Sequence, residues 1–191
     1  MQSFEEFYNT SIIPSLINKF NYKNYYQVPK IVKIKLVFTV NDTKSLHNEN
    51  VLVSLQALQI LGGYNSYPTI LQDFNSSYSK DKITVCENIL EGNTLYNFLT
   101  RFITLDLPSL KFFQGFSFGS SQEGGSYRFT INDPLAFFDL GEEYEKFNSL
   151  KKLDIIFFTT CNSLEECKAF FNLLQIPIIT KNDTTKNELI R

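Results

Sequence analysis

The stretch FNYKNYYQVPKIVKIKL, Phe20 to Leu36, has the pattern of a helix end, a turn at Pro29 and the start of a strand. Because successive side chains of a strand point to opposite faces, the residues after the turn divide into two sets. One set is Ile31, Lys33, Lys35 and Val37, and the other is Val32, Ile34, Leu36 and Phe38. The second set is wholly apolar and is predicted to be buried. The two lysines of the first set fit either a solvated face or a surface for nucleic acid.

Predicted helices and strands alternate along the chain. Apolar residues at helical spacing predict a helix over Phe4–Phe20, which Pro14 bends or splits. A second helix is expected over Asn50–Leu61, with Gly62-Gly63 as its stop and an apolar side of Leu52, Leu55, Leu58 and Leu61. A third is expected from a cap at Asn93 to a point before Pro108, and a last one after the capping box of Ser163 and Glu166.

Strands are predicted over residues 30–40, 83–90, 127–131 and 153–160, and residues 41–45 have the composition of a loop. This order indicates an α+β fold, an antiparallel sheet with helices packed on one side. With 191 residues and 43% hydrophobic residues, we expect one domain over residues 1–178 and a charged C-terminal tail over 179–191. No apolar run is long enough to span a membrane, so no membrane partner is expected.

Residues for catalysis or metal binding are scarce. His47 is the only histidine, which rules out a histidine metal cluster, and its place in the polar run 44–50 favours a surface residue over a catalytic one. The three cysteines, Cys86, Cys161 and Cys167, form no CxxC pair, so neither a disulfide framework nor a zinc site is expected. The glycine-rich run Gly119–Ser126 lacks the lysine of a phosphate-binding loop and is interpreted as a flexible loop. We therefore predict no enzyme activity, no catalytic residue and no cofactor.

Four collinear blocks resemble one known family. They are Phe20–Leu36, LYNFLTRFITLDLPSLKFFQGFS at Leu95–Ser117, GSYRFTINDPLAFFDL at Gly125–Leu140 and LDIIFFTTCNSLEECKAFFNLLQIP at Leu153–Pro177. In order and spacing they are similar to the ribosomal protein L-five family, which holds 5S rRNA in bacterial-type ribosomes. The resemblance implies an L-five-like fold, a place in the central protuberance of the large ribosomal subunit, and large-subunit rRNA and neighbouring ribosomal proteins as partners.

Candidate RNA-binding residues gather around the opening strand. Amides and lysines suited to phosphate, 2′-OH and base-edge contacts are Asn24, Gln27, Lys30, Lys33 and Lys35. Arg101, Lys111 and Lys151 match basic residues of the family. Each of these side chains has an alternative interpretation as a solvated surface charge.

Departures from the family pattern point away from RNA. Val37 stands where the family has an amide, and Glu91 stands where it has an arginine. The chain carries 18 basic and 20 acidic residues, a net charge of −2, which is unusual for an RNA-bound protein. We therefore expect 5S rRNA binding to be weakened or lost and neighbouring proteins to cover this surface. The loop between Gly63 and Cys86, which the family directs toward P-site tRNA, has only Lys80 and Lys82 as cations, so that contact is also expected to be reduced.

Composition indicates an A/T-rich gene, with 19 Phe, no Trp and few Gly. The chain also begins without an Arg- and Ser-rich leader, so we expect a protein encoded and used in the mitochondrion, in the matrix ribosome. A plastid or an A/T-rich bacterium would give a similar composition. Two other functions stay open: a conventional 5S-rRNA-binding protein of an organellar or bacterial ribosome, and a non-ribosomal protein-interaction module, which would not co-sediment with ribosomes.

Overall fold

The computed structural model describes residues 4–42, 47–63, 67–72, 82–111, 113, 115–117 and 125–179. Within these ranges five strands form an antiparallel sheet in the order β2-β3-β1-β6-β5, and β4 and β7 pair in a small parallel sheet. The predicted α+β fold is confirmed. The chain divides into two compact units, described in turn. The first unit is Met1–Val32, Phe112–Phe129 and Phe157–Arg191, and the second unit is Lys33–Lys111 and Thr130–Ile156.

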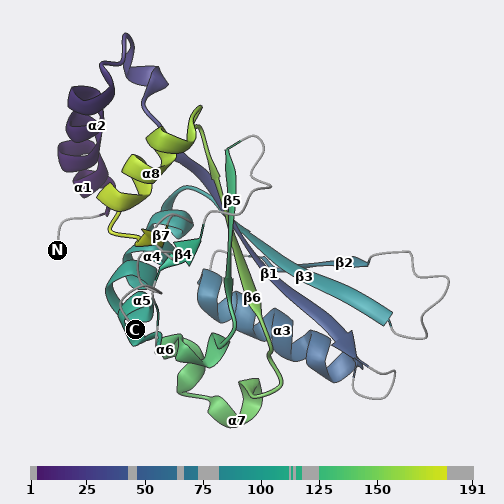
Figure 1. Ribbon diagram of the computed structural model, residues 1–191. Helices are drawn as coiled ribbons and strands as arrows, with labels where there is room; N and C mark the ends of the chain where they lie inside the picture. Colours follow the sequence, from purple (N-terminus) through teal and green to yellow (C-terminus); the bar gives the residue numbers. More distant parts are fainter. Residues whose placement is uncertain are drawn as a thin grey trace, which may run out of the picture. The chain divides into compact units, whose positions relative to one another are not determined.

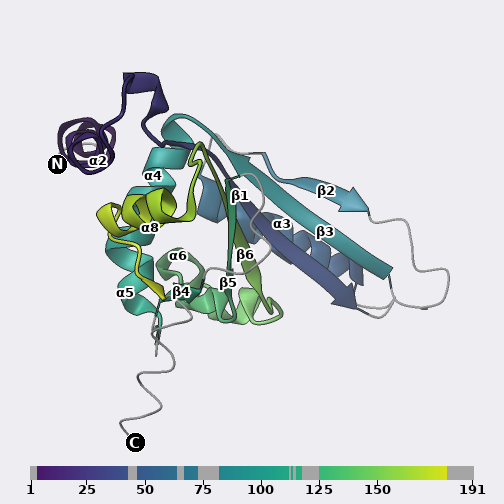
Figure 2. The ribbon, with the colours of Figure 1, turned by 45° about the horizontal axis from the view of Figure 1, so that its top comes forward.

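The second unit is built on β1 (Ile31–Asp42), β3 (Lys82–Leu90) and β2 (Thr69–Gln72), which lie side by side in Figure 2. The predicted alternation of β1 holds where it pairs with β3: Ile34, Leu36, Phe38 and Val40 are buried. Val32 is 49% exposed, contrary to prediction, because it precedes the β3 ladder, which begins at Ile34. Val37 is buried although it shares the lysine face. Strand β2 had no clear sequence signal, and Asn41 and Asp42 extend β1 into the predicted loop.

Helix α3 (His47–Gly62) covers the apolar face of this part of the sheet, and in Figure 1 it runs along β1 and β3. Its buried side chains are Val51, Ser54, Ala57, Leu58 and Leu61. Leu52, predicted to be buried, is exposed. A run of leucines at every third residue drifts off one face of a helix that has 3.6 residues per turn. The helix ends at Gly62 as predicted, and Gly63 adopts a φ of 80°.

Helix α4 (Asn93–Arg101) continues through a π-helical turn (Phe102–Asp106) into α5 (Leu107–Ser109). The predicted end before Pro108 is therefore wrong. Proline removes one N–H donor and crowds the carbonyl four residues earlier, and a π-helical turn changes the hydrogen-bond spacing at that place. Asn93 is the first helical residue rather than the cap, which is Gly92. The unit also contains a 3₁₀ turn at Pro134–Ala136 and the short helices α6 (Phe138–Gly141) and α7 (Tyr144–Phe147).

The first unit opens with α1 (Phe4–Phe7), a π-helical turn (Tyr8–Ile12) and α2 (Ile13–Phe20). Pro14 lies in the first turn of α2, directly after this π-helical turn, and the helix continues past it, so the predicted split does not occur. Asn21 ends α2 in the left-handed conformation, with φ 50°. Helix α8 (Leu164–Leu173) contacts α2 and lies next to it in Figure 1. The small sheet of this unit pairs β4 (Phe116–Ser117) with β7 (Ile178–Ile179).

Aromatic rings fill the core of the first unit. Phe129 of β5 (Ser126–Ile131) and Phe157 of β6 (Leu153–Thr159) contact Phe171 of α8, with ring centroids 5.4 to 5.7 Å apart. Half of the predicted capping box is present, since Ser163 Oγ accepts a hydrogen bond from Glu166 N. The Glu166 carboxylate accepts from Asn162 N, one residue before the cap, rather than from Ser163 N. All three cysteines are buried. Among the described residues, none of the helices has the length and hydropathy needed to cross a bilayer.

Candidate nucleic-acid interface

Three of the predicted RNA-binding residues lie at a 3₁₀ turn of the first unit, Tyr25–Gln27. Gln27 N donates to Asn24 O at 3.0 Å, and the side chain of Gln27 accepts a hydrogen bond from Lys23 N at 3.3 Å. The Gln27 side chain therefore stabilises the turn, and Asn24, Gln27 and Lys30 are all exposed.

The rest of the protein fixes this turn at both ends. Before it, the Tyr22 hydroxyl donates to Glu166 Oε1. After it, the Tyr8 hydroxyl donates to Pro29 O at 2.8 Å, and Lys30 and Thr160 exchange two hydrogen bonds of 3.0 Å. These partners are distant in sequence, so the turn is fixed by tertiary structure rather than by its local sequence.

Lys33 and Lys35 lie on the face of β1 opposite α3, as predicted. In the β1–β3 register Lys35 is opposite Ile89 and Val37 is opposite Glu87, which makes Lys35 and Glu87 diagonal neighbours. The Lys35 ammonium forms an ion pair with the Glu87 carboxylate, whose side chain is 9% exposed. The charge of Lys35 is therefore paired within the fold, a contact that the sequence alone did not indicate.

Arg101 forms an ion pair and a hydrogen bond within the second unit. Its Nη1 forms an ion pair with Asp139 Oδ2 at 2.7 Å, and its Nη2 donates to the carbonyl of Leu61 at the end of α3. The guanidinium thus joins α4, α3 and α6. Asp139 lies 38 positions along the chain, so sequence reasoning could not find this pairing.

Asp106 lies close to this arginine and is 3% exposed. Its Oδ1 accepts a hydrogen bond from Phe138 N at 3.2 Å. Burial raises the pKa of the carboxyl group to about 6, although the hydrogen bond from Phe138 N and the charge of Arg101 lower it. Asp106 is thus a buried carboxyl group of the second unit whose pKa lies above its ordinary value.

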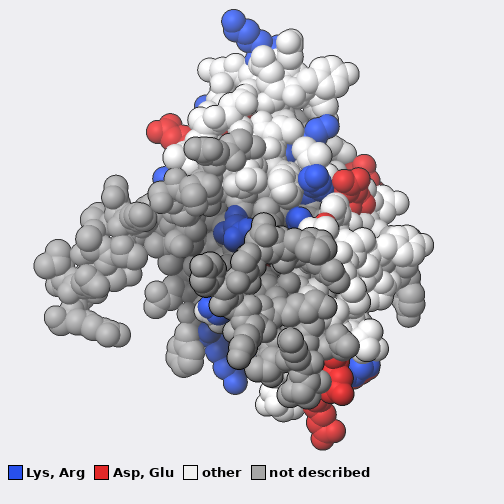
Figure 3. Space-filling model, turned by 90° about the vertical axis from the view of Figure 1, so that its right-hand side faces the viewer, with Lys and Arg blue, Asp and Glu red and all other residues white. Residues whose placement is uncertain are grey.

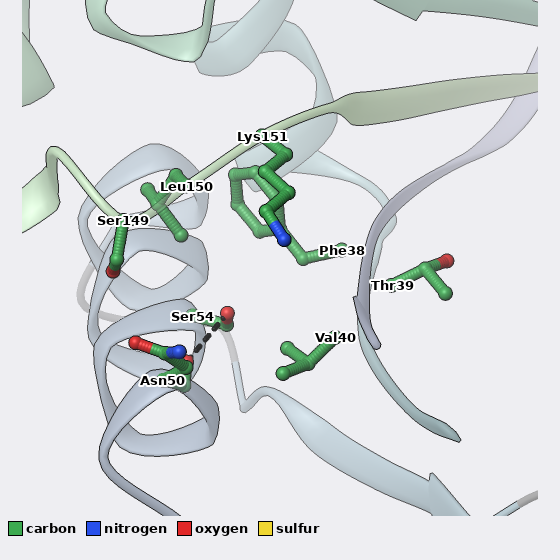
Figure 4. A pocket seen from close by; sticks show the side chains of 8 residues that line it. All are labelled: Phe38, Thr39, Val40, Asn50, Ser54, Ser149, Leu150 and Lys151. Carbon is green, nitrogen blue, oxygen red and sulfur yellow. Dashed lines mark hydrogen bonds between the residues drawn. The ribbon is translucent and has the colours of Figure 1, made fainter. Parts of the chain in front are cut away.

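Lys111 and Lys151 complete the predicted set, and both are exposed overall. Lys151 lines a hollow together with Phe38 and Val40 of β1 and Asn50 and Ser54 of α3. Figure 4 shows its side chain directed into this hollow, on the α3 side of the sheet. Lys33 and Lys35 lie on the other face of β1, so the predicted basic residues of the second unit do not form one surface.

Charged residues of both signs are visible on the face that Figure 3 shows. In the view of Figure 3, basic side chains stand singly or in small groups among uncharged ones, with acidic side chains beside some of them. Within the described ranges no three His, Cys, Asp or Glu residues gather as metal ligands. The predicted loop Gly119–Ser126 lies outside these ranges up to residue 124, as do residues 64–66 and 73–81 of the predicted tRNA loop and the tail after residue 179.

Replacing Arg101 with Met should lower the free energy of unfolding by about 2 kcal/mol, because it leaves the Leu61 carbonyl and the Asp139 carboxylate without this partner. Both side chains of the ion pair are 28% exposed, so solvent screens their attraction and the loss stays below that of a fully buried pair. Arg101→Lys should recover only part of the loss, since one ammonium cannot reproduce the planar fork. Urea unfolding measures these changes.

Lys111→Met is the matched control, since it removes an exposed basic residue of the same unit and should change stability by less than about 0.5 kcal/mol. If the Arg101 variant is as stable as this control but binds RNA less tightly, Arg101 contacts RNA and has no structural role.

Known proteins resemble this chain over nearly its whole length. A family model that describes the C-terminus of the ribosomal L5 family matches residues 84–178. The large ribosomal subunit protein uL5c of Oltmannsiellopsis viridis is 33% identical over 92% of this chain and 97% of its own length. The protein uL5m of Reclinomonas americana is 32% identical (93% and 98%), and uL5 of Wolbachia sp. subsp. Drosophila simulans (strain wRi) is 31% identical (91% and 98%). The chain therefore belongs to the ribosomal L5 family of large-subunit ribosomal proteins.

Proposed function

We propose that this chain is a structural protein of the large subunit of a mitochondrial ribosome, located in the central protuberance and in contact with rRNA and neighbouring ribosomal proteins. Family membership over more than nine-tenths of the chain carries this proposal. Proteins of this family are structural and non-enzymatic, which confirms the prediction that the chain is not an enzyme. The mitochondrial assignment rests on the phenylalanine-rich, tryptophan-free composition, and the relative uL5m is compatible with it.

We further propose that 5S rRNA binding is weakened or lost. The side chains of Lys35 and Arg101 form ion pairs with acidic residues, and the Gln27 side chain holds its own turn. Each of these contacts competes with RNA for a predicted RNA-binding group. Electrostatic attraction to phosphate dominates affinity for RNA, so fewer free cations and a net charge of −2 lower the expected affinity. The same reasoning leads us to expect little contact with P-site tRNA.

A conventional 5S-rRNA-binding protein is the second candidate. The bacterial uL5 and the protein uL5c match this chain about as well as uL5m does, so the comparisons favour no single compartment. The 5S-binding role persists in this alternative, with Lys30 and Lys33 among the contacts.

Crosslinking in the native particle distinguishes these possibilities. RNA attached to the chain is recovered and sequenced, and we expect reads from the large rRNA with few or none from a small 5S-like RNA. Abundant 5S reads would overturn the weakened-binding proposal and favour the second candidate. Absence of the chain from ribosomal fractions would overturn both and indicate a non-ribosomal interaction module.

A further inference from the structure

Tyr25 and Tyr26, on the turn that precedes β1, are 60% and 94% exposed. Their rings meet edge to face, with centroids 6.1 Å apart and an interplanar angle of 82°. Within the described residues neither hydroxyl hydrogen-bonds to another protein group, unlike those of Tyr8 and Tyr22 on either side. The two rings are therefore not part of the core, and packing within this fold gives no reason for aromatic residues at these positions.

Hydrogen bonds within the turn and at both of its ends hold the two rings in their exposed position. The hydrogen bonds described above hold the turn internally through Gln27 and at its ends through Tyr22, Pro29 and Lys30. Binding to preformed rings costs less conformational entropy than binding to a loose segment of the protein, which would first have to be ordered. This geometry is typical of a recognition site rather than of a flexible connection.

The charge around the rings identifies the class of ligand. From residue 19 to residue 32 the first unit carries Lys19, Lys23 and Lys30 and no acidic residue. Lys23 and Lys30 are exposed and flank the tyrosine pair. The acid known to touch this segment is Glu166, a buried carboxylate already bound to Tyr22. A partner that combines flat apolar surfaces with negative charge complements this arrangement.

Single-stranded RNA has both properties. Its unpaired bases stack on exposed aromatic side chains, and its phosphates bind lysine. Duplex RNA hides its bases and offers only phosphates and 2′-hydroxyls. We propose that Tyr25 and Tyr26 form a stacking platform for unpaired bases of a single-stranded RNA segment, with Lys23 and Lys30 on the adjoining phosphates. The inference rests on the proposed contact with rRNA and specifies the RNA structure that the contact selects, an unpaired loop or bulge.

The test is fluorescence anisotropy with the purified full chain and labelled RNA of about 12 nucleotides, single-stranded or duplex, at one fixed salt concentration. Tyr25→Ala/Tyr26→Ala should weaken binding to single-stranded RNA about tenfold or more and change duplex binding by less than about twofold. Tyr25→Phe/Tyr26→Phe should bind like the wild type, because the ring rather than the hydroxyl makes the contact. Lys23→Gln/Lys30→Gln should weaken binding to both RNAs.

Tyr67→Ala is the matched control, since Tyr67 is 82% exposed but belongs to the second unit and is not flanked by lysine. It should leave both affinities unchanged. The platform is overturned if the wild type binds RNA and the double-alanine variant binds equally well, while the proposed rRNA contact then stands. If the wild type binds neither RNA, the rRNA contact in the proposed function fails and the platform with it. A double-alanine variant that keeps its RNA affinity but is excluded from ribosomal particles would show that the rings bind a protein instead.

Discussion

Replacing Gly125 with Ala should lower the free energy of unfolding by about 3 kcal/mol or more. Gly125 has a φ of 75°, where a side chain is strained, and a Cβ atom built there would lie 2.5 Å from the carbonyl oxygen of Thr159. The neighbour cannot easily move, because Thr159 N and Thr159 Oγ1 donate to the Gly125 carbonyl at 2.8 and 3.0 Å. The new methyl group therefore forces apart the start of β5 and the end of β6. Urea unfolding of the full chain measures the loss.

Gly63→Ala separates the strain of a positive φ from the close approach of a Cβ atom to the Thr159 carbonyl. Gly63 also has a positive φ, 80°, but none of the described residues has an atom within 4 Å of a Cβ atom built there. This control should cost only about 1 kcal/mol, the price of the left-handed conformation for a residue with a side chain. Equal losses at the two glycines would mean that the close approach to Thr159 has no energetic consequence.

Local patterns predicted the elements of this protein well wherever one physical rule acts alone. Alternation along β1 placed Ile34, Leu36 and Phe38 in the core, because a strand that is covered on one face has a period of two. The rule that proline ends a helix worked less well. It predicted a break at Pro14 and an end before Pro108, whereas at both prolines the chain inserts a π-helical turn and the helix continues. Local sequence does not encode this compensation, which depends on packing.

Contacts between distant residues could not be predicted from one sequence. Arg101 is predicted to bind RNA because it matches a basic residue of the family, and Lys35 because it lies on the opening strand. Their ion pairs with Asp139 and Glu87 exist only once α6 and β3 are in place. The tyrosine pair was missed for a different reason: aromatic residues beside a strand normally enter the core, and the sequence gives no sign that the fold leaves Tyr26 almost fully exposed. The one sequence signal for this site is a pair of tyrosines in a segment that contains lysines and no acidic residue.

Replacing Asp106 with Asn should change how stability depends on pH. The pKa of Asp106 is raised from 3.8 to about 6 by burial, so between these values the folded protein binds more protons than the unfolded chain. The contribution of this carboxyl group to stability is therefore full below pH 4 and falls as the pH rises through about 6. Asp106→Asn should remove that decline and raise the free energy of unfolding at pH 7 by up to about 3 kcal/mol. Urea unfolding at pH 4, 5, 6 and 7 measures the difference between variant and wild type.

The contacts of Asp106 also favour a rise in the free energy of unfolding when Asn replaces it at pH 7. The Asn side chain can still accept the hydrogen bond from Phe138 N. The second carboxylate oxygen of Asp106, which lacks a partner among the described residues, is replaced by an uncharged NH₂ group. The substitution also weakens the interaction with Arg101, the nearby cation, so the increase in the free energy of unfolding should stay below the upper value given above. Glu145→Gln removes one exposed carboxylate from α7 and controls for the change in net charge. If stability differs from the wild type by the same amount at every pH for both variants, Asp106 is not a buried carboxylate that titrates near pH 6.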